Sequence, residues 1–162
     1  VDVQFRNINY AINGFRDNPA LTIKNNYNFL NPKLGITYNK NNWQVYASYA
    51  LAQHEPNRND FEAGTAQQPK PELLNDFEAG IEQKKTNYSF GVNLYYMKYK
   101  DQLVLTGKIN DVGAYTRTNI PKSYRAGVEL QGTYVAAKWV NIAANIALSK
   151  NKIKNFTEYL DD

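Results

Sequence analysis

Hydrophobic and polar residues alternate strictly along several stretches of this chain. The clearest stretch has Tyr124, Ala126, Val128, Leu130, Gly132 and Tyr134 at one parity, and Arg125, Gly127, Glu129, Gln131 and Thr133 at the other. Successive side chains of a β-strand point to opposite faces, so this stretch predicts a strand with one apolar and one polar face. The same alternation predicts further strands within residues 1–12, 33–38, 43–51, 76–82, 88–97 and 140–149.

The connections between these strands alternate between short and long. Short turns are predicted at 39–42, at 84–87 and near Ala137-Lys138, whereas 13–30, 53–72 and 101–121 are predicted as long connections. Tight turns at one rim and long loops at the other are typical of a transmembrane β-barrel. Within the third long connection, Leu103-Val104-Leu105 is expected to extend a strand beyond the bilayer.

Two stretches allow more than one local structure. In the first strand the apolar parity switches from Val1, Val3 and Phe5 to Ile8, Tyr10 and Ile12. This switch predicts either a β-bulge near Arg6–Asn7 or a strand that leaves the membrane there. Alanine is frequent over 135–150, so a helix competes with a strand, but the strict period of two from Val140 to Leu148 favours the strand.

Aromatic residues flank the predicted apolar stretches. Tyr38, Trp43, Tyr88, Tyr134 and Trp139 lie near short turns, and Tyr49, Tyr96 and Tyr124 lie at the opposite strand ends. The stretch from Tyr124 to Tyr134 would be ~33 Å long. Tilted by ~45° it would rise ~23 Å, close to the ~25 Å apolar band of an outer-membrane barrel.

The polar parity carries the charges of the predicted strands. Glu78, Glu82, Arg125 and Glu129 occupy it, and in a barrel these side chains would face the lumen. A soluble β-sandwich shows the same alternation with its apolar face buried, so it remains the alternative fold. The expected fold class is all-β: an antiparallel up-and-down meander of about seven strands that belongs to a larger transmembrane β-barrel.

Composition excludes several classes of function. The 162 residues include no cysteine and one histidine, His54, so no disulfide framework, thiolate nucleophile or His-cluster metal site is expected. Nineteen Lys and Arg against fifteen Asp and Glu give a net charge of +4, but the basic residues are scattered, and nucleic-acid binding is not expected. No apolar run approaches the ~18 residues of a transmembrane helix. The chain does not begin with methionine and shows no signal peptide, so we expect a piece of a longer protein.

Three motifs in order resemble the barrel domain of TonB-dependent outer-membrane receptors. They are Pro32-Lys33-Leu34-Gly35-Ile36-Thr37-Tyr38, Tyr46-Ala47-Ser48-Tyr49 with the following Glu55-Pro56-Asn57-Arg58, and Lys70-Pro71-Glu72 with Phe77-Glu78-Ala79-Gly80. Leu94-Tyr95-Tyr96 followed by Asp101 resembles the family's next hairpin. The style of the motifs is similar to the iron-siderophore branch of the family, and the resemblance covers nearly the whole chain.

The resemblance implies TonB-energised import of an iron-siderophore or a similar nutrient across the outer membrane. It implies as partners a plug domain, the TonB complex, outer-membrane lipid and lipopolysaccharide, with no catalytic residue, no metal site and no cofactor. Residues 1–162 are expected to form a partial barrel without plug or closing strand, because such transporters have 22 strands. A passive porin-type or autotransporter barrel section and a lectin-like β-sandwich are the alternative functions.

The resemblance also suggests site residues. Tyr46, His54 and Arg58, expected near the top of the third strand and its loop, suit capture of anionic aromatic siderophores by charge-assisted hydrogen bonds and stacking, or else pack the loop. Glu78, Glu82, Arg125 and Glu129 are expected to face the lumen and the plug; a glycosidase pair at Glu78 and Glu82 would need a cleft and a raised pKa. The lysines near the long loops either meet lipopolysaccharide phosphates or form a solvated face; they are Lys98, Lys100, Lys150, Lys152 and Lys154.

Overall fold

The computed structural model describes residues 1–15, 18–61, 68–109, 115–154 and 156 of the chain. These residues form β-strands and one short 3₁₀ helix: β1 (Asp2–Phe15), β2 (Asn18–Lys40), β3 (Trp43–His54), η1 (Arg58–Phe61), β4 (Glu72–Lys84), β5 (Tyr88–Lys100), β6 (Gln102–Ile109), β7 (Tyr115–Ile120), β8 (Ser123–Ala137) and β9 (Val140–Ile153). Among them, no helix is long and apolar enough to cross a membrane.

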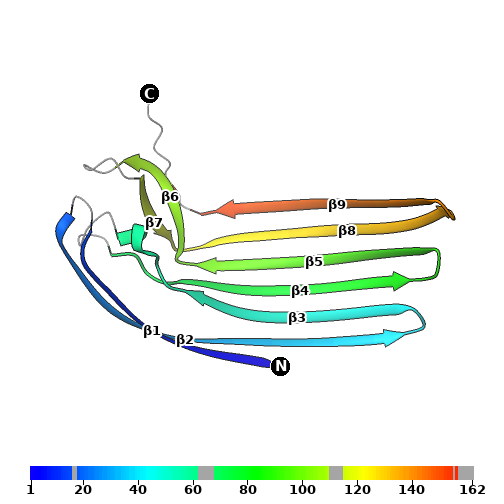
Figure 1. Ribbon diagram of the computed structural model, residues 1–162, viewed down its shortest axis with the longest axis horizontal. Helices are drawn as coiled ribbons and strands as arrows, with labels where there is room; N and C mark the ends of the chain where they lie inside the picture. Colours follow the sequence, from blue (N-terminus) through cyan, green and yellow to red (C-terminus); the bar gives the residue numbers. More distant parts are fainter. Residues whose placement is uncertain (16–17, 62–67, 110–114, 155, 157–162) are drawn as a thin grey trace.

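Seven of the strands form one antiparallel sheet in the order β1-β2-β3-β4-β5-β8-β9. The remaining pair, β6 and β7, forms a separate two-stranded sheet. The short turns β2–β3, β4–β5 and β8–β9 lie together at one end of the long strands, and the long connections lie at the other (Figure 1). This arrangement confirms the predicted meander and the predicted separation of short from long connections.

The local predictions for the turns and the last strand are also confirmed. Asn41 and Asn42 have positive φ of 46° and 69°, the conformation that a two-residue hairpin turn requires. Residues 140–153 form β9 rather than a helix, and they pair with β8 from Ser123↔Ile153 to Ala137↔Val140. The period of two therefore outweighed the frequent alanines.

The prediction of a long loop over 13–30 is wrong. Most of this segment belongs to β2, which is 23 residues long and pairs with β1 in register from Asp2↔Lys33 to Asn13↔Thr22. Asparagine side chains support this hairpin instead of breaking it. Asn7 Nδ2 donates to Asn28 Oδ1 at 2.7 Å, and Asn26 Nδ2 donates to Asn9 Oδ1 at 2.5 Å. Amides that bond each other across the strands offset their low intrinsic strand propensity.

The change of parity in β1 occurs without a bulge. Register with β2 is unbroken through Arg6↔Phe29 and Asn7↔Asn28, and it first shifts between Asn13 and Phe15. One face of the hairpin therefore changes from apolar at Phe5 to polar at Asn7. Of the two predicted alternatives, the regular register supports a strand that passes out of the apolar zone.

The third long connection also contains more strand than expected. Leu103-Val104-Leu105 is extended, as predicted, but it belongs to β6 and pairs with β7 through Leu103↔Asn119 and Leu105↔Arg117. It does not lengthen the main sheet. β5 pairs directly with β8, from Tyr88↔Tyr134 to Tyr99↔Ser123, so the β6–β7 hairpin projects from the end of that pair.

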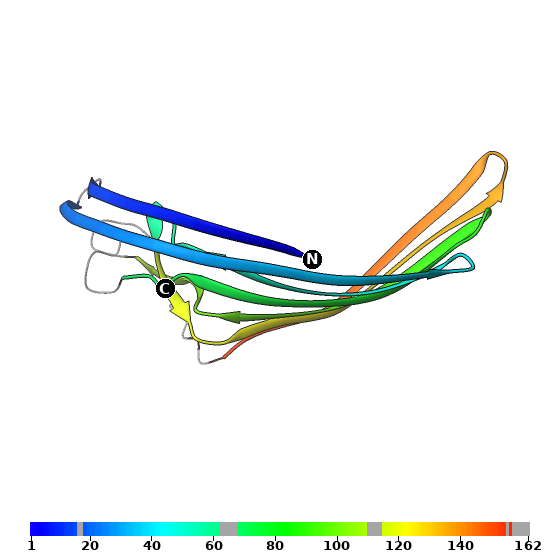
Figure 2. The ribbon, with the colours of Figure 1, turned by 90° about the horizontal axis from the view of Figure 1, so that it is seen from below.

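The sheet is a single curved layer (Figure 2). Its apolar face, called here the outward face, stays exposed: Ile36 is 73% exposed, Ile146 57% and Leu148 67%. In the described part of the chain no second layer covers it, which excludes the β-sandwich architecture. The buried hydrophobic cluster is small and lies on the opposite, inward face. It occupies the part of the β1–β2 hairpin that extends past β3, where Ile12, Leu21, Ile23 and Phe61 pack together with Tyr10.

The apolar zone of the outward face crosses the strands obliquely. On β2 it ends toward the long connections at Leu30, beyond which lies Asn28; on β9 it ends at Leu148, beyond which lies Lys150. The pairings place Leu148 level with Ile36, six residues along β2 from Leu30. This displacement of ~20 Å over five strand spacings of ~4.8 Å corresponds to a slope of about 40°.

The other edge of the zone is displaced in the same direction. On β2 the last apolar outward residue is Tyr38, which lies level with Ile146. On β9 the zone continues beyond Ile146 to Ile142. The zone is thus a band of roughly constant width, and the strands are tilted relative to its edges.

Candidate functional site

The inward face carries a hollow lined by polar side chains. It has a volume of ≈ 360 Å³, and its polar lining includes Tyr46, Glu82, Asn93, Glu129, Gln131 and Asn145. These residues come from β3, β4, β5, β8 and β9, because the curvature of the sheet directs its polar parity toward a common space. Glu82 and Glu129, predicted to face a lumen, therefore line one concave wall.

Tyr46 links three strands across this wall. Its hydroxyl donates to Asn93 Oδ1 at 2.8 Å, and Asn93 Nδ2 donates to Glu129 Oε2 at 3.4 Å. The Tyr46 ring crosses β4 at Gly80, where an added Cβ would lie 2.4 Å from Tyr46 Cε1. Tyr95 lies over Gly127 in the same way, at 2.5 Å from the Cβ position. Each tyrosine fills the space above a strand glycine and gives that position a packing partner.

Replacing Gly80 by alanine is expected to destabilise the intact protein by about 1–3 kcal/mol, because the Tyr46 ring must move and release Asn93. Gly35→Ala is the matched control: it lies on the same face, and its Cβ would meet only ordinary contacts at 3.7 and 3.8 Å. Denaturant titration of both variants measures the difference in free energy of unfolding. Equal losses in the two variants would show that the ring does not occupy this space.

Three carboxylates surround Tyr46. Glu78, Glu82 and Glu129 all interact electrostatically with its hydroxyl. None of the three forms an ion pair with a described residue. The middle of the inward wall therefore carries uncompensated negative charge, which attracts cationic groups that approach it.

A second group of inward residues, with charged, aromatic and apolar side chains, lies nearer the long connections. Arg125, on the inward face of β8, places its guanidinium carbon 5.6 Å from the centre of the Tyr99 ring. It pairs across the sheet with Met97, which in turn pairs with Asp76. Asp76 Oδ1 is buried and has no hydrogen-bond partner among the described residues. Arg125 therefore belongs to the inward face, as predicted, but lies apart from the Tyr46 group.

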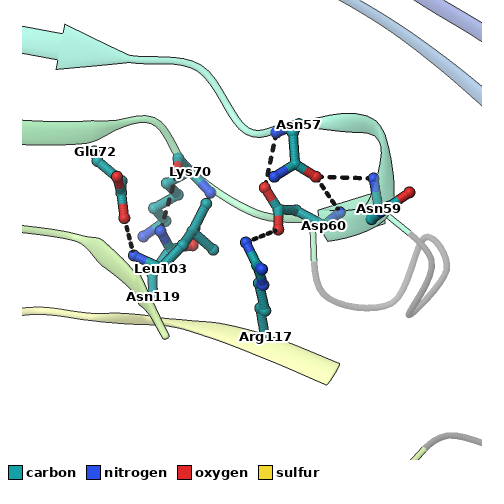
Figure 3. A network of polar contacts seen from close by, with 8 residues as sticks. All are labelled: Asn57, Asn59, Asp60, Lys70, Glu72, Leu103, Arg117 and Asn119. Atoms are coloured by element: carbon teal, nitrogen blue, oxygen red, sulfur yellow. Dashed lines mark hydrogen bonds and ion pairs between the residues drawn. The ribbon is translucent and has the colours of Figure 1, made fainter. Parts of the chain in front are cut away.

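Beyond the sheet, Asp60 organises the connection between β3 and β4 (Figure 3). Its side chain is 2% exposed and receives Arg117 Nη1 of β7 at 3.2 Å. Its other carboxylate oxygen accepts the Asn57 amide at 2.7 Å, while Asn57 Oδ1 accepts the amides of Asn59 and Asp60. One buried carboxylate thus holds η1 and ties it to the β6–β7 hairpin.

Asn119 joins the same two segments a second time (Figure 3). Its Oδ1 accepts the Lys70 amide at 2.7 Å, and its Nδ2 donates to the carbonyls of Lys70 and Asp101 at 2.9 and 2.6 Å. Glu72, at the start of β4, accepts the Leu103 amide. The β3–β4 connection and the β6–β7 hairpin therefore form one polar unit.

The β1–β2 hairpin contacts this unit from the other side. Phe61 stacks on Tyr10 with ring centres 5.4 Å apart, and Arg6 forms an ion pair with Glu55 at 3.0 Å. Burial raises the pKa of Tyr10, and the positive charge of Arg58 opposes this shift. Burial also raises the pKa of Tyr27, against a hydrogen bond from Asn25.

The structure separates the three residues expected to meet a ligand. Tyr46 lies eight residues before His54 on β3, or ~27 Å along the strand, near the short-turn end. His54 and Arg58 are both exposed at the long-connection end, and Arg58 lies close enough to Tyr10 for electrostatic interaction. The expectation that Tyr46 lies near the top of the strand is therefore wrong. Tyr46 instead belongs to the inward wall described above, where its hydroxyl bonds Asn93.

Several organising residues escaped prediction. Asn93 and Gly80 act through cross-strand register, which a period of two does not reveal. Asp60, Arg117 and Asn119 lie in segments treated as long connections; the apolar pair Leu103 and Leu105 was the one available sign of structure there. Among the described residues, no cluster of His, Cys, Asp or Glu could hold a metal ion.

A single curved, open sheet with an apolar convex band and a polar concave wall defines a section of a β-barrel wall. The family model of the TonB dependent receptor-like β-barrel matches residues 2–162. The chain belongs to this family. The family is one of receptors, in keeping with the expectation of a non-enzyme.

Solved structures share the fold. The FrpB iron transporter from Neisseria meningitidis (F3-3 variant) is 19% identical, with a TM-score of 0.66 and coverage of 84% of this chain and 21% of that chain. The copper transporter OprC is 15% identical, with a TM-score of 0.73 and coverage of 85% of this chain and 23% of that chain. The chain thus spans about a fifth of the length of these structures. A comparison with curated proteins finds no match.

Proposed function

We propose that this chain forms a section of the wall of an outer-membrane receptor barrel. The observation that carries the proposal is the oblique apolar band, because its slope of about 40° agrees with the ~35–45° tilt of strands in transmembrane barrels. The outward face then meets lipid and the inward face lines the lumen. By the usual orientation of such barrels, the short turns face the periplasm and the long connections face the exterior.

We propose further that residues 1–162 are a partial barrel that lacks plug and closing strand. The backbone edges of β1 and β9 are unpaired within the described sheet. Unpaired backbone groups in hydrocarbon cost several kcal/mol each, so additional strands must cover both edges in a membrane. The plug and the inner-membrane TonB complex would then be partners of the same receptor.

The function we propose is TonB-energised import of an iron-siderophore or a similar scarce nutrient. Family membership supports this proposal, and the polar lining of the inward wall fits a water-filled lumen. In this scheme Glu78, Glu82, Arg125 and Glu129 face the lumen and the plug. Tyr46 stiffens that wall, whereas His54 and Arg58 contact ligand at the exterior end.

Arg58→Gln in the intact receptor is expected to weaken binding of anionic ferric chelates at least 10-fold, because a charge-assisted hydrogen bond is lost. Lys24→Gln, which removes an exposed outward charge at the same end, is the control. Binding of ferric catecholate and ferric hydroxamate chelates is measured by fluorescence quenching, together with iron-limited growth. Equal affinity in both variants would show that Arg58 does not contact the ligand. Uptake in the absence of TonB would indicate a passive pore.

A further inference from the structure

Lysines cluster on the outward face immediately beyond the apolar band. Lys98 of β5 pairs with Tyr124 of β8, which pairs with Lys152 of β9. Two residues closer to the short turns, Ala126 of β8 pairs with Lys150 of β9. Because these positions share the parity of Val128 and Leu148, the lysines project from the same face as the apolar band. Adjacent strands are ~4.8 Å apart, so Lys98 and Lys152 flank Tyr124 at ~10 Å from each other.

No described residue supplies a counter-charge to these lysines. Lys98, Lys150 and Lys152 are exposed, and none forms an ion pair with a described residue. Tyr124 lies level with Lys98 and Lys152, and Tyr96 lies level with Lys150. The two rings have centres 6.0 Å apart and mark the edge of the band. The patch therefore combines an apolar base, two aromatic rings and at least three free ammonium groups.

The charge is local rather than a continuous ring. Immediately beyond the band on β1 and β2, the outward residues are the neutral Asn7, Asn9, Asn26 and Asn28, which bond one another. The next outward charge there is the single Lys24, two residues beyond Asn26 on β2. General solubility of the rim would not require the lysines to gather on β5 and β9, the two neighbours of β8. Their gathering indicates a partner that meets this side of the wall.

We propose that Lys98, Lys150 and Lys152 bind the phosphate groups of an anionic lipid in the outer leaflet. The inference rests on the proposed membrane orientation, which places the patch at headgroup level at the exterior end. Acyl chains would then lie on Val128, Leu130 and Leu148, while the phosphates reach the ammonium groups beside the tyrosines. A soluble phosphate lacks the chains, so it gains nothing from the adjoining apolar surface. Basic residues at a membrane surface contribute to anionic lipid binding in this way.

The test uses the intact receptor in neutral detergent and the bis-phosphorylated glycolipid lipid A as the probe. The variant Lys98→Gln/Lys150→Gln/Lys152→Gln is expected to bind lipid A roughly 100-fold more weakly, because each lysine contributes about five-fold in affinity. Lys84→Gln/Lys85→Gln/Lys138→Gln removes the same charge at the short-turn end and should bind normally. Native mass spectrometry counts bound lipid, and folding is checked by heat-modified gel mobility.

Two further arms separate the sources of binding. Dephosphorylated lipid A should lose the affinity, and inorganic phosphate should not compete at millimolar concentration. Equal lipid A binding by both triple variants, or full competition by inorganic phosphate, would overturn the lipid site.

A cysteine probe tests the proposed membrane orientation separately from the proposed lipid A site. The chain holds no cysteine, so Leu130→Cys adds its single thiol, and labelling of the unsubstituted receptor gives the background to be subtracted. In lipid vesicles it should resist a water-soluble maleimide. Rapid labelling would reject the membrane orientation itself, whereas protection combined with unchanged lipid A binding would reject only the lysine site.

Discussion

Leu130→Arg is expected to destabilise the membrane-inserted receptor by about 2–4 kcal/mol, the range for a basic residue near the bilayer midplane on the lipid-facing side of a barrel. Leu130 lies in the middle of the apolar band of β8 and is 39% exposed. Arginine there must bring its charge into hydrocarbon or bend away to the interface. Denaturant-dependent folding into lipid vesicles gives the free energy directly.

The neighbouring residue supplies the control. Gln131 is adjacent in sequence and points to the inward face, where it lines the hollow. Gln131→Arg adds the same charge within one residue but places it near Glu129 and Glu82, so little loss is expected. If Gln131→Arg were the more harmful change, the polar face of the sheet would have to be the one that meets lipid.

Asp60→Ala is expected to open the exterior connections at a cost of about 2–4 kcal/mol in local stability. The substitution removes the acceptor of the Asn57 amide and leaves Arg117 without its partner. Loss of one member of a buried ion pair typically costs 3–5 kcal/mol, and the partial exposure of Arg117 reduces this value. Hydrogen exchange over 55–61 and 117–120 should rise together, because Asp60 joins both segments.

Asn59→Ala is the matched control for this change. Its side chain is exposed, and only its backbone amide takes part in the network. Exchange in the main sheet should not change in either variant. Faster exchange confined to 55–61 after Asp60→Ala would show that the two connections are not coupled through this carboxylate.

Alternation alone predicted the main sheet, because each strand from β3 to β5 and from β8 to β9 has one face that differs consistently from the other. It failed over 13–30, where Asn, Gly and Pro suggested a loop. Leu21 and Ile23 lie two residues apart there, and both are 1% exposed. Their spacing indicated a strand, but the buried partner Phe61 comes from a distant segment, so tertiary packing overrode local propensity.

The site was less predictable than the sheet. The inward parity of Glu78, Glu82, Arg125 and Glu129 followed from the period of two. The association of Tyr46 with Asn93 did not, because it depends on how far one strand slides past the next and on the absence of a side chain at Gly80. Such register is set by the complete set of pairings rather than by any single strand.

The direct pairing of β5 with β8 has a consequence for how this protein changes over evolutionary time. β6 and β7 form a sheet of their own outside the wall, so lengthening or replacing this hairpin need not disturb the pairing of any neighbouring strand. The hairpin can therefore change in sequence and length while the strand pairing of the wall stays fixed. Such change should stop at the contacts that anchor the hairpin, namely those of Arg117 with Asp60, of Asn119 with Lys70, and of Leu103 with Glu72.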